Sequence, residues 1–223
     1  MIRLSAFQRL LAAFAAFILG MIICRVLYSG SLRFIFLLWN LFLAWIPFRI
    51  SLYLSGRKIP KGWQAGLLLT GWLLFFPNAL YIITDLIHLE ARTNVPIWYD
   101  AVLLFTSAIA GLMLAFASLY KIEEYFSKQI SNSAANKLIL VCLFIGSFGV
   151  YLGRFLRWNS WDIITNPYEL AKEIAVRLLF PIEYYRTWAI TLLFTCLFSL
   201  LYFTIKKLTV YGTSRSKESP MEE

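Results

Sequence analysis

The sequence predicts an all-α protein: a polytopic transmembrane helix bundle of about six spans, with one interfacial amphipathic helix. Two observations support this fold class. Hydrophobic residues make up 60% of the 223 residues and charged residues only 15%, a composition too apolar for a water-soluble domain. The apolar residues also fall into blocks of about 20, the length that a helix needs to cross a hydrocarbon core roughly 30 Å thick. These continuous runs lack the alternation of barrel strands, so helices are the expected spans.

The apolar blocks form one expected transmembrane domain, residues 1–210. The predicted spans are residues 7–28, 32–54, 64–87, 97–120, 137–156 and 187–205. The first block follows Arg3 and Arg9 but precedes no small-x-small cleavage site, so we expect an uncleaved anchor rather than a signal peptide. Residues 211–223, rich in Ser, Lys and Glu, are expected to form a disordered cytoplasmic tail.

The net charge of +9 reflects where the basic residues lie relative to the spans. They cluster at the ends of the apolar blocks rather than along a soluble face, so no nucleic-acid partner is expected. With the N-terminus inside, more Lys and Arg fall on inner segments than on outer ones, which predicts that both termini are cytoplasmic. The three cysteines lie singly within spans, a pattern that indicates core packing rather than disulfides or a zinc site.

The third span carries polar residues along one helical face. Pro77 is expected to kink this helix because proline lacks the backbone N–H. Asn78, Tyr81, Asp85 and His88 follow at spacings of 3, 4 and 3 residues, so they share a face. This face is either a polar contact between helices or the wall of a polar pocket. Two ligands, Asp85 and His88, are too few to define a metal site, and we expect no metal or other cofactor.

The fourth and fifth spans place charges at the same membrane face. Asp100 stands at the start of the fourth span, where the helix dipole favours a negative charge. Arg154 and Arg157 lie one turn apart at the outer end of the fifth span, against the positive-inside rule, and Asn159 and Asp162 follow. Since the outer ends of spans three to five coincide, we expect these residues to form one cluster. It is either a buried ion-pair network or a positively charged pocket for a phosphate or carboxylate.

The segment after this cluster predicts the interfacial helix. Asn166 and Pro167 supply a cap and a first helical residue for Tyr168–Phe180. Its charged residues occupy one face and its Leu and Ile residues the other, so we expect it to lie in the outer interface and to cover the polar cluster.

Small and polar residues elsewhere in the spans predict contacts between helices. Asn40 in the second span is expected to make an interhelical hydrogen bond rather than to contact a ligand. Residues of low volume at four-residue spacing let another backbone approach closely. They are Ser107, Gly111 and Ala115 in the fourth span and Gly149 and Gly153 in the fifth.

Four segments carry a family resemblance: Trp39–Pro47, Phe75–Leu89, Trp98–Asp100 and Tyr151–Asp162. They resemble the bacterial integral membrane family called domain of unknown function 1361, over roughly residues 35–205. The resemblance implies a multi-pass protein of the bacterial cytoplasmic membrane with a single conserved domain. It implies no activity, so no catalytic residue follows from it.

Three functional hypotheses fit these features. In the first, an extracytoplasmic site binds or processes an anionic amphiphile, such as a lipid or polyprenyl phosphate, with membrane lipids as partners. If the protein is an enzyme, Asp85 or His88 would be the general base and Arg154 and Arg157 would bind the anion. The expected substrate-binding residues are Asn78, Tyr81, Asp100, Arg154, Arg157, Asn159 and Asp162.

The other two hypotheses assign no chemistry to the cluster. A small transporter or channel would use the proline-kinked third span to bring polar groups toward mid-membrane. A scaffold or assembly subunit would use the charges structurally and the small-residue stripes to meet a partner.

Overall fold

The computed structural model is all-α, as the sequence predicts. It describes residues 5–56, 62–90 and 94–218, with side chains described through residue 209, and this part of the chain contains helices and no strand. The elements are α1 (Ala6–Ser29), α2 (Phe36–Leu54), α3 (Trp63–Tyr81), the 3₁₀ helix η1 (Ile82–His88), α4 (Ile97–Ser127), α5 (Asn132–Phe155), α6 (Asp162–Thr165), α7 (Pro167–Leu179) and α8 (Tyr185–Glu218).

Six helical segments in the described residues are long and apolar enough to cross a membrane. They are Ala6–Ser29, Phe36–Leu54, Trp63–His88, Ile97–Ser127, Asn132–Phe155 and Tyr185–Thr209. Each contains most of one expected span. Three helices extend further than expected: α4 reaches Ser127, α5 begins at Asn132, and α8 reaches Glu218 into the segment expected to be a disordered tail. Residues 219–223 lie outside the described part of the chain.

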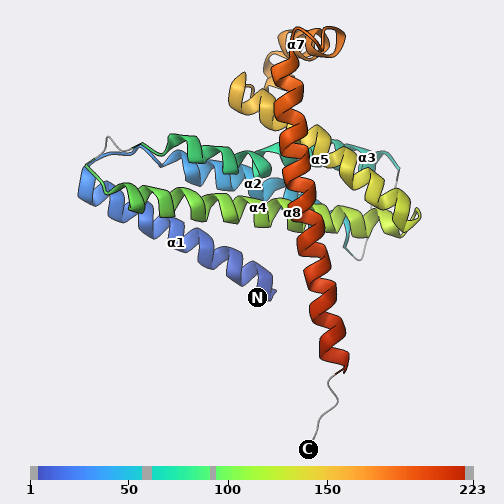
Figure 1. Cartoon of the computed structure of the whole chain (residues 1–223), viewed down its shortest axis with the longest axis horizontal. Helices are drawn as coiled ribbons and strands as arrows, with labels where there is room; N and C mark the ends of the chain where they lie inside the picture. The colour runs from blue at the N-terminus through green and yellow to red at the C-terminus, as the bar shows by residue number, and fades with distance from the viewer. Residues whose placement is uncertain (1–4, 57–61, 91–93, 219–223) are drawn as a thin grey trace, which may run out of the picture.

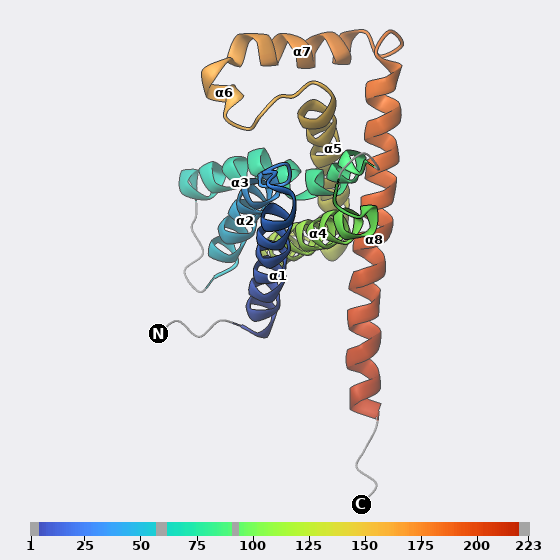
Figure 2. The same ribbon diagram turned by 90° about the vertical axis from the view of Figure 1, so that its left-hand side faces the viewer.

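The helices do not form a simple parallel bundle. Figure 1 shows α1, α2 and α4 running alongside one another, whereas α8 crosses α4, and the turned view in Figure 2 agrees. Close contacts join α2 to both α3 and α4, and join α5 to both α3 and α8. In Figure 2, α7 lies across one end of α8, with α6 beside it. We call this the α7 end of the molecule.

Two hydrophobic clusters make the core. The larger one joins α2, α3, α4, α5 and α8 and includes the fully buried Phe76, Leu80 and Phe198. The smaller one packs α1 against α2 and α4 around Ile18 and Leu37. Water does not drive helices together inside a bilayer, so close packing has to supply much of the association energy.

Glycines in α4 and α5 set the approach of α3. A Cβ atom on Gly149 would lie 2.5 Å from Pro77 Cγ, and one on Gly146 would lie 2.9 Å from Phe76 Cε1. A Cβ atom on Gly111 would lie 2.9 Å from two side-chain atoms of Ile82. The small-residue stripes predicted from the sequence therefore include two real contact points, while Gly153 has ordinary van der Waals space.

Gly149→Ala is expected to lower the free energy of unfolding by about 1–3 kcal/mol, because the rigid Pro77 ring cannot yield without moving the α3 backbone. The measurement is the midpoint of unfolding by sodium dodecyl sulfate in dodecyl maltoside micelles, followed by tryptophan fluorescence. Gly20→Ala in α1 is the control, since no atom lies within 4 Å of its added Cβ. Equal midpoints for the two variants would contradict the predicted contact.

Candidate functional site

Asp85 lies at the centre of a polar contact between α2, η1 and α5. It is fully buried; its Oδ2 accepts a hydrogen bond from Asn40 Nδ2 at 2.9 Å, and its Oδ1 forms an ion pair with Arg154. Arg154 Nε donates to Thr84 Oγ1 at 2.7 Å, and its Nη1 lies 3.0 Å from His88 Nε2. Each nitrogen of the guanidinium therefore has a protein partner.

The local backbone explains why these groups meet. The chain tightens from α-helix to 3₁₀ helix at Ile82, and in a 3₁₀ helix residues three apart lie directly above one another. Asp85 and His88 are spaced in this way, so both face Arg154. The Arg154 guanidinium also stacks on the Tyr81 ring, with 4.1 Å between Cζ and the ring centroid. The side chains of Arg154 and Asp85 are only 8% and 1% exposed, so the result is a buried and mutually neutral pair.

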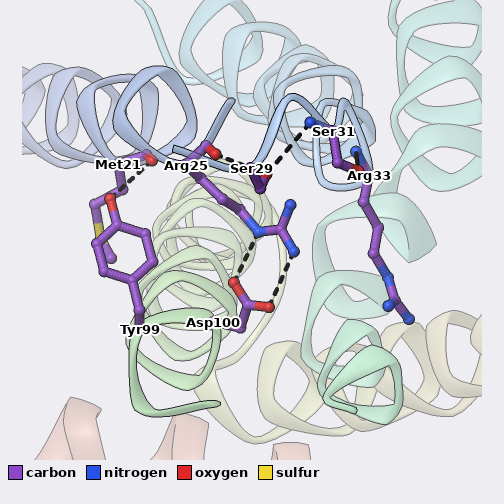
Figure 3. Close-up of polar contacts among 7 residues, drawn as sticks. All are labelled: Met21, Arg25, Ser29, Ser31, Arg33, Tyr99 and Asp100. Carbon is purple, nitrogen blue, oxygen red and sulfur yellow. Dashed lines mark hydrogen bonds and ion pairs between the residues drawn. The ribbon is translucent and has the colours of Figure 1, made fainter. Parts of the chain in front are cut away.

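A second buried ion pair joins α1 to α4. Arg25 Nε and Nη2 donate to the two carboxylate oxygens of Asp100 at 2.8 and 3.1 Å, and the two side chains are 2% and 1% exposed. Figure 3 shows this two-point contact, with the neighbouring Arg33 pointing away from Asp100. The Arg25 Cζ atom lies 4.6 Å from the centre of the Phe34 ring. Bidentate geometry is the arrangement that best repays the burial of two charges.

The single cluster expected from the sequence is therefore divided. Asp100 pairs with Arg25 rather than with Arg154 or Arg157, because α1 brings its own arginine to the start of α4. Asp162 accepts hydrogen bonds from the backbone and side-chain nitrogens of Asn159 at 2.6 and 3.3 Å, so it stabilises the turn into α6. Arg157 is exposed and adopts the left-handed conformation with φ of 62° where α5 ends.

A cavity of about 390 Å³ lies at the α7 end, between α2, α3, α5 and the α6–α7 segment. It adjoins the Asp85–Arg154 pair, since Asn40 and Tyr81 contact that pair and also line the cavity. Its polar lining consists of Asn40, Thr70, Asn78, Tyr81, Asn159 and Ser160. Trp39, Trp158 and Trp161 also line it. Within the described residues the lining includes no charged side chain. Asp85, His88 and Arg154 therefore do not line the cavity themselves, although Asp85 and Arg154 contact residues that do.

The loop after α5 is tied to α3 next to the cavity. Asn78 Nδ2 donates to Ser160 Oγ at 2.8 Å and to the Phe75 carbonyl at 3.1 Å, and Ser160 Oγ donates to the Leu74 carbonyl at 3.0 Å. A proline in a helix leaves nearby carbonyls in need of other donors. Asn78 and Ser160 supply such donors to the carbonyls of Phe75 and Leu74, which lie two and three residues before Pro77. Both contacts of Asn78 use its amide nitrogen rather than its oxygen.

The amphipathic helix α7 borders this cavity through Leu170 and Ile174, its apolar face. One residue of its expected charged face behaves differently. Arg177 is buried, donates to the Glu173 carbonyl at 2.8 Å and pairs with the Glu173 carboxylate. Trp188 of α8 donates to the Arg177 carbonyl at 3.2 Å. These contacts hold the C-terminal end of α7 against α8 and so position its apolar face over the cavity.

Sequence reasoning placed the Asp85, His88 and Arg154 contact and the polar face of Asn78 and Tyr81. It did not single out Arg25, which lies within the first apolar block. The detectable signal was its burial cost, since an arginine within an apolar block needs a carboxylate partner. Ser160 carried no such signal because a serine in a loop is ordinary. Within the described residues no three His, Cys, Asp or Glu side chains are placed to hold a metal ion.

The fold and these buried polar contacts define a multi-pass α-helical membrane protein with a cavity at one end. The chain belongs to the family described as "protein of unknown function (DUF1361)", whose model matches residues 39–203. This confirms the family resemblance of the sequence. The matched region contains Asp85, Asp100, Arg154 and the cavity, whereas Arg25 on α1 precedes it. No curated protein and no solved structure matches the chain.

Proposed function

We propose that this protein binds an amphiphilic ligand, a lipid or lipid-linked molecule, in the cavity at the α7 end. The observation that carries the proposal is the mixed lining of the cavity. Apolar side chains such as Leu73 and Ile145 line it together with the neutral polar groups of Asn78, Asn159 and Ser160. Such a pocket suits a molecule with an apolar tail and a hydrogen-bonding head group.

The tryptophans support the same class of ligand. Trp and Tyr favour the membrane interface, where one side of the ring meets hydrocarbon and the polar N–H or O–H meets water. Trp39, Trp158 and Trp161 surround the cavity, and Trp39 contacts Trp161 with 6.5 Å between ring centroids. Tryptophans around the cavity therefore support a site at interface depth, where a lipid head group lies.

An anionic head group, the kind expected from the sequence, would meet Arg157 rather than Arg154. Arg154 has a protein partner on each guanidinium nitrogen. Arg157 is exposed and directly precedes Trp158 of the cavity lining. The phosphate or carboxylate would thus bind at the rim, with the side-chain amide of Asn159 as a further hydrogen-bond donor.

Binding has more support than processing. A general base has to reach the proton that it removes, and neither Asp85 nor His88 lines the cavity. Both carboxylate oxygens of Asp85 are occupied, by Asn40 and by Arg154. Transport has less support because Gly111 and Gly146 bring α4 and α5 into close contact with the α3–η1 segment between the two ends of the molecule.

The test uses farnesyl phosphate and farnesol, which share a tail and differ in charge, titrated into the purified protein in detergent micelles. Tryptophan fluorescence reports occupancy, since three tryptophans line the cavity. We expect saturable binding of both, tighter for the phosphate. Ile145→Phe should weaken both at least tenfold, a loss of about 1.4 kcal/mol, because the larger side chain fills part of the cavity.

The matched control is Val141→Phe, one turn earlier on α5 and about as exposed but outside the lining. Arg157→Gln should weaken farnesyl phosphate and leave farnesol unchanged. Non-saturable responses, or equal effects of Ile145→Phe and Val141→Phe, would refute binding in this cavity. Equal loss of both ligands in Arg157→Gln would refute the role of Arg157 in anion binding.

A further inference from the structure

A second and larger cavity, of about 910 Å³, lies away from the α7 end. Its walls come from α1, α2, α4 and α8, at the place where α8 has crossed α4 and diverges from it (Figure 1). Phe7 and Phe48, which contact each other with 6.0 Å between ring centroids, form part of one wall. This cavity shares no lining residue with the one under α7.

The second cavity changes from apolar to polar along its length. On α4 the lining runs from Ile109 through Met113 and Phe116 to Tyr120 and Lys121. On α8 it runs from Leu201 through Ile205 to Lys206 and Thr209, and the first residues of α1 add Ser5 and Gln8. Tyr202 contacts Phe116 and donates to Glu123, and Lys206 pairs with Glu123, so the polar ends of the α4 and α8 linings lie close together. The shape therefore fits an acyl chain along α4 and a head group beyond Tyr120.

Two lysines make the polar end positive. Lys121 Nζ lies 2.7 Å from Glu124, and Lys206 pairs with Glu123 and donates to Asn136 Oδ1 at 3.1 Å. Both lysine side chains are about one-third exposed and line the cavity, whereas neither glutamate does. Each lysine is held by a glutamate that does not line the cavity, so the charged side chains of the described lining are both cationic. An ammonium has three N–H donors, which leaves donors for a ligand anion.

We propose that this cavity binds one anionic phospholipid, with its phosphate between Lys121 and Lys206 and an acyl chain against α4. Basic pockets between transmembrane helices bind anionic head groups because the charge attraction adds to the burial of the chains. A zwitterionic lipid would gain the apolar contacts but less of the electrostatic attraction. The site needs neither the α7 cavity nor its ligand.

The experiment is native mass spectrometry of the full-length protein, with dioleoyl phosphatidylglycerol and dioleoyl phosphatidylcholine added in equal amounts. The chains are identical, so any preference reports the head group. We expect one phosphatidylglycerol retained about tenfold over phosphatidylcholine. Lys121→Gln should reduce this preference at least threefold, and Ala117→Phe, which narrows the apolar wall, should reduce retention of both lipids.

Matched controls separate the site from general charge and size effects. Lys128 pairs with Glu124 as Lys121 does, but it does not line the cavity, so Lys128→Gln should leave the preference unchanged. Val102→Phe places the same side chain on an exposed face of α4 outside the cavity. No preference for phosphatidylglycerol, or equal effects of Lys121→Gln and Lys128→Gln, would overturn the proposal. A dimer that Ala117→Phe dissociates would show instead that a second copy fills the cavity.

Discussion

Asp100→Ala is expected to lower the free energy of unfolding by about 3–5 kcal/mol, because it leaves the Arg25 guanidinium buried without a counterion. The pair has the features that make this cost large. Both side chains are at most 2% exposed, and both carboxylate oxygens accept from Arg25. The Nη1 atom of Arg25 already has no hydrogen-bond partner within the described residues. No second acceptor is therefore in place to replace the carboxylate.

Unfolding by sodium dodecyl sulfate in dodecyl maltoside micelles, followed by circular dichroism, measures this loss. The double variant Arg25→Met with Asp100→Leu should recover most of it, since replacing a buried ion pair by apolar side chains of similar volume is often nearly neutral. Glu169→Ala is the control, because its 3.8 Å pair with Lys172 is about half exposed and should contribute less than about 1 kcal/mol. A double variant as unstable as Asp100→Ala would show that charge pairing is not what the two residues provide.

Asp85→Ala is expected to cost about as much, roughly 3–5 kcal/mol, since Arg154 would lose its only ion-pair partner among the described residues. Asn40→Ala removes the other partner of the same carboxylate and should cost less, about 1.5–3 kcal/mol for one hydrogen bond to a charged group. This order follows from the contacts: without Asn40 the carboxylate keeps Arg154, whereas without Asp85 the arginine keeps Thr84, His88 and the Tyr81 ring but no carboxylate.

The same unfolding assay, paired with the farnesyl phosphate titration, separates a structural from a functional role for Asp85. A stabilising role predicts that Asp85→Leu with Arg154→Met unfolds near the wild-type midpoint and binds the ligand normally. Asn159→Ala, at an exposed cavity residue, should do the opposite and weaken binding with little change in stability. If Asp85→Ala kept full stability and lost only binding, Asp85 would belong to the ligand site.

Much of the helical framework was predictable. Blocks of about 20 apolar residues define spans whatever the rest of the chain does, because every backbone polar group in a bilayer has to bond within its own helix. The amphipathic helix α7 was predictable from its two-sided composition and from Pro167 at its first position, although the expected cap Asn166 makes no side-chain capping hydrogen bond. The Asp85 and Arg154 contact was partly predictable. An arginine at the outer end of a span goes against the usual charge distribution, and a charge within the membrane usually pairs with an opposite charge.

The division of the charges into two pairs was not predictable in the same way. Arg25 and Asp100 are 75 residues apart, and nothing local to either one selects the other. The sequence offered Asp85 and Asp100 as equal partners for the arginines of α5. Only the packing of α1 against α2 and α4 around Ile18 and Leu37 brings Arg25 to Asp100.

The cytoplasmic location of both termini remains a prediction from charge distribution. A reporter fused within residues 92–95, between η1 and α4, would test it, and we expect an extracytoplasmic signal. A cytoplasmic signal would invert the molecule, so that the α7 cavity would face the cytoplasm and the Lys121 and Lys206 cavity the outside.

By itself, the sequence determined that this is a multi-pass helical membrane protein, where its spans lie and which polar residues they carry. These properties depend on hydrophobicity and periodicity within windows of one helix length. Only the tertiary structure decided that α8 crosses α4, that Asp100 belongs to Arg25, and that neutral rather than charged side chains line the α7 cavity. Those outcomes depend on which helix faces meet, and that is settled by close contacts such as Gly149 against Pro77 between segments far apart in the chain.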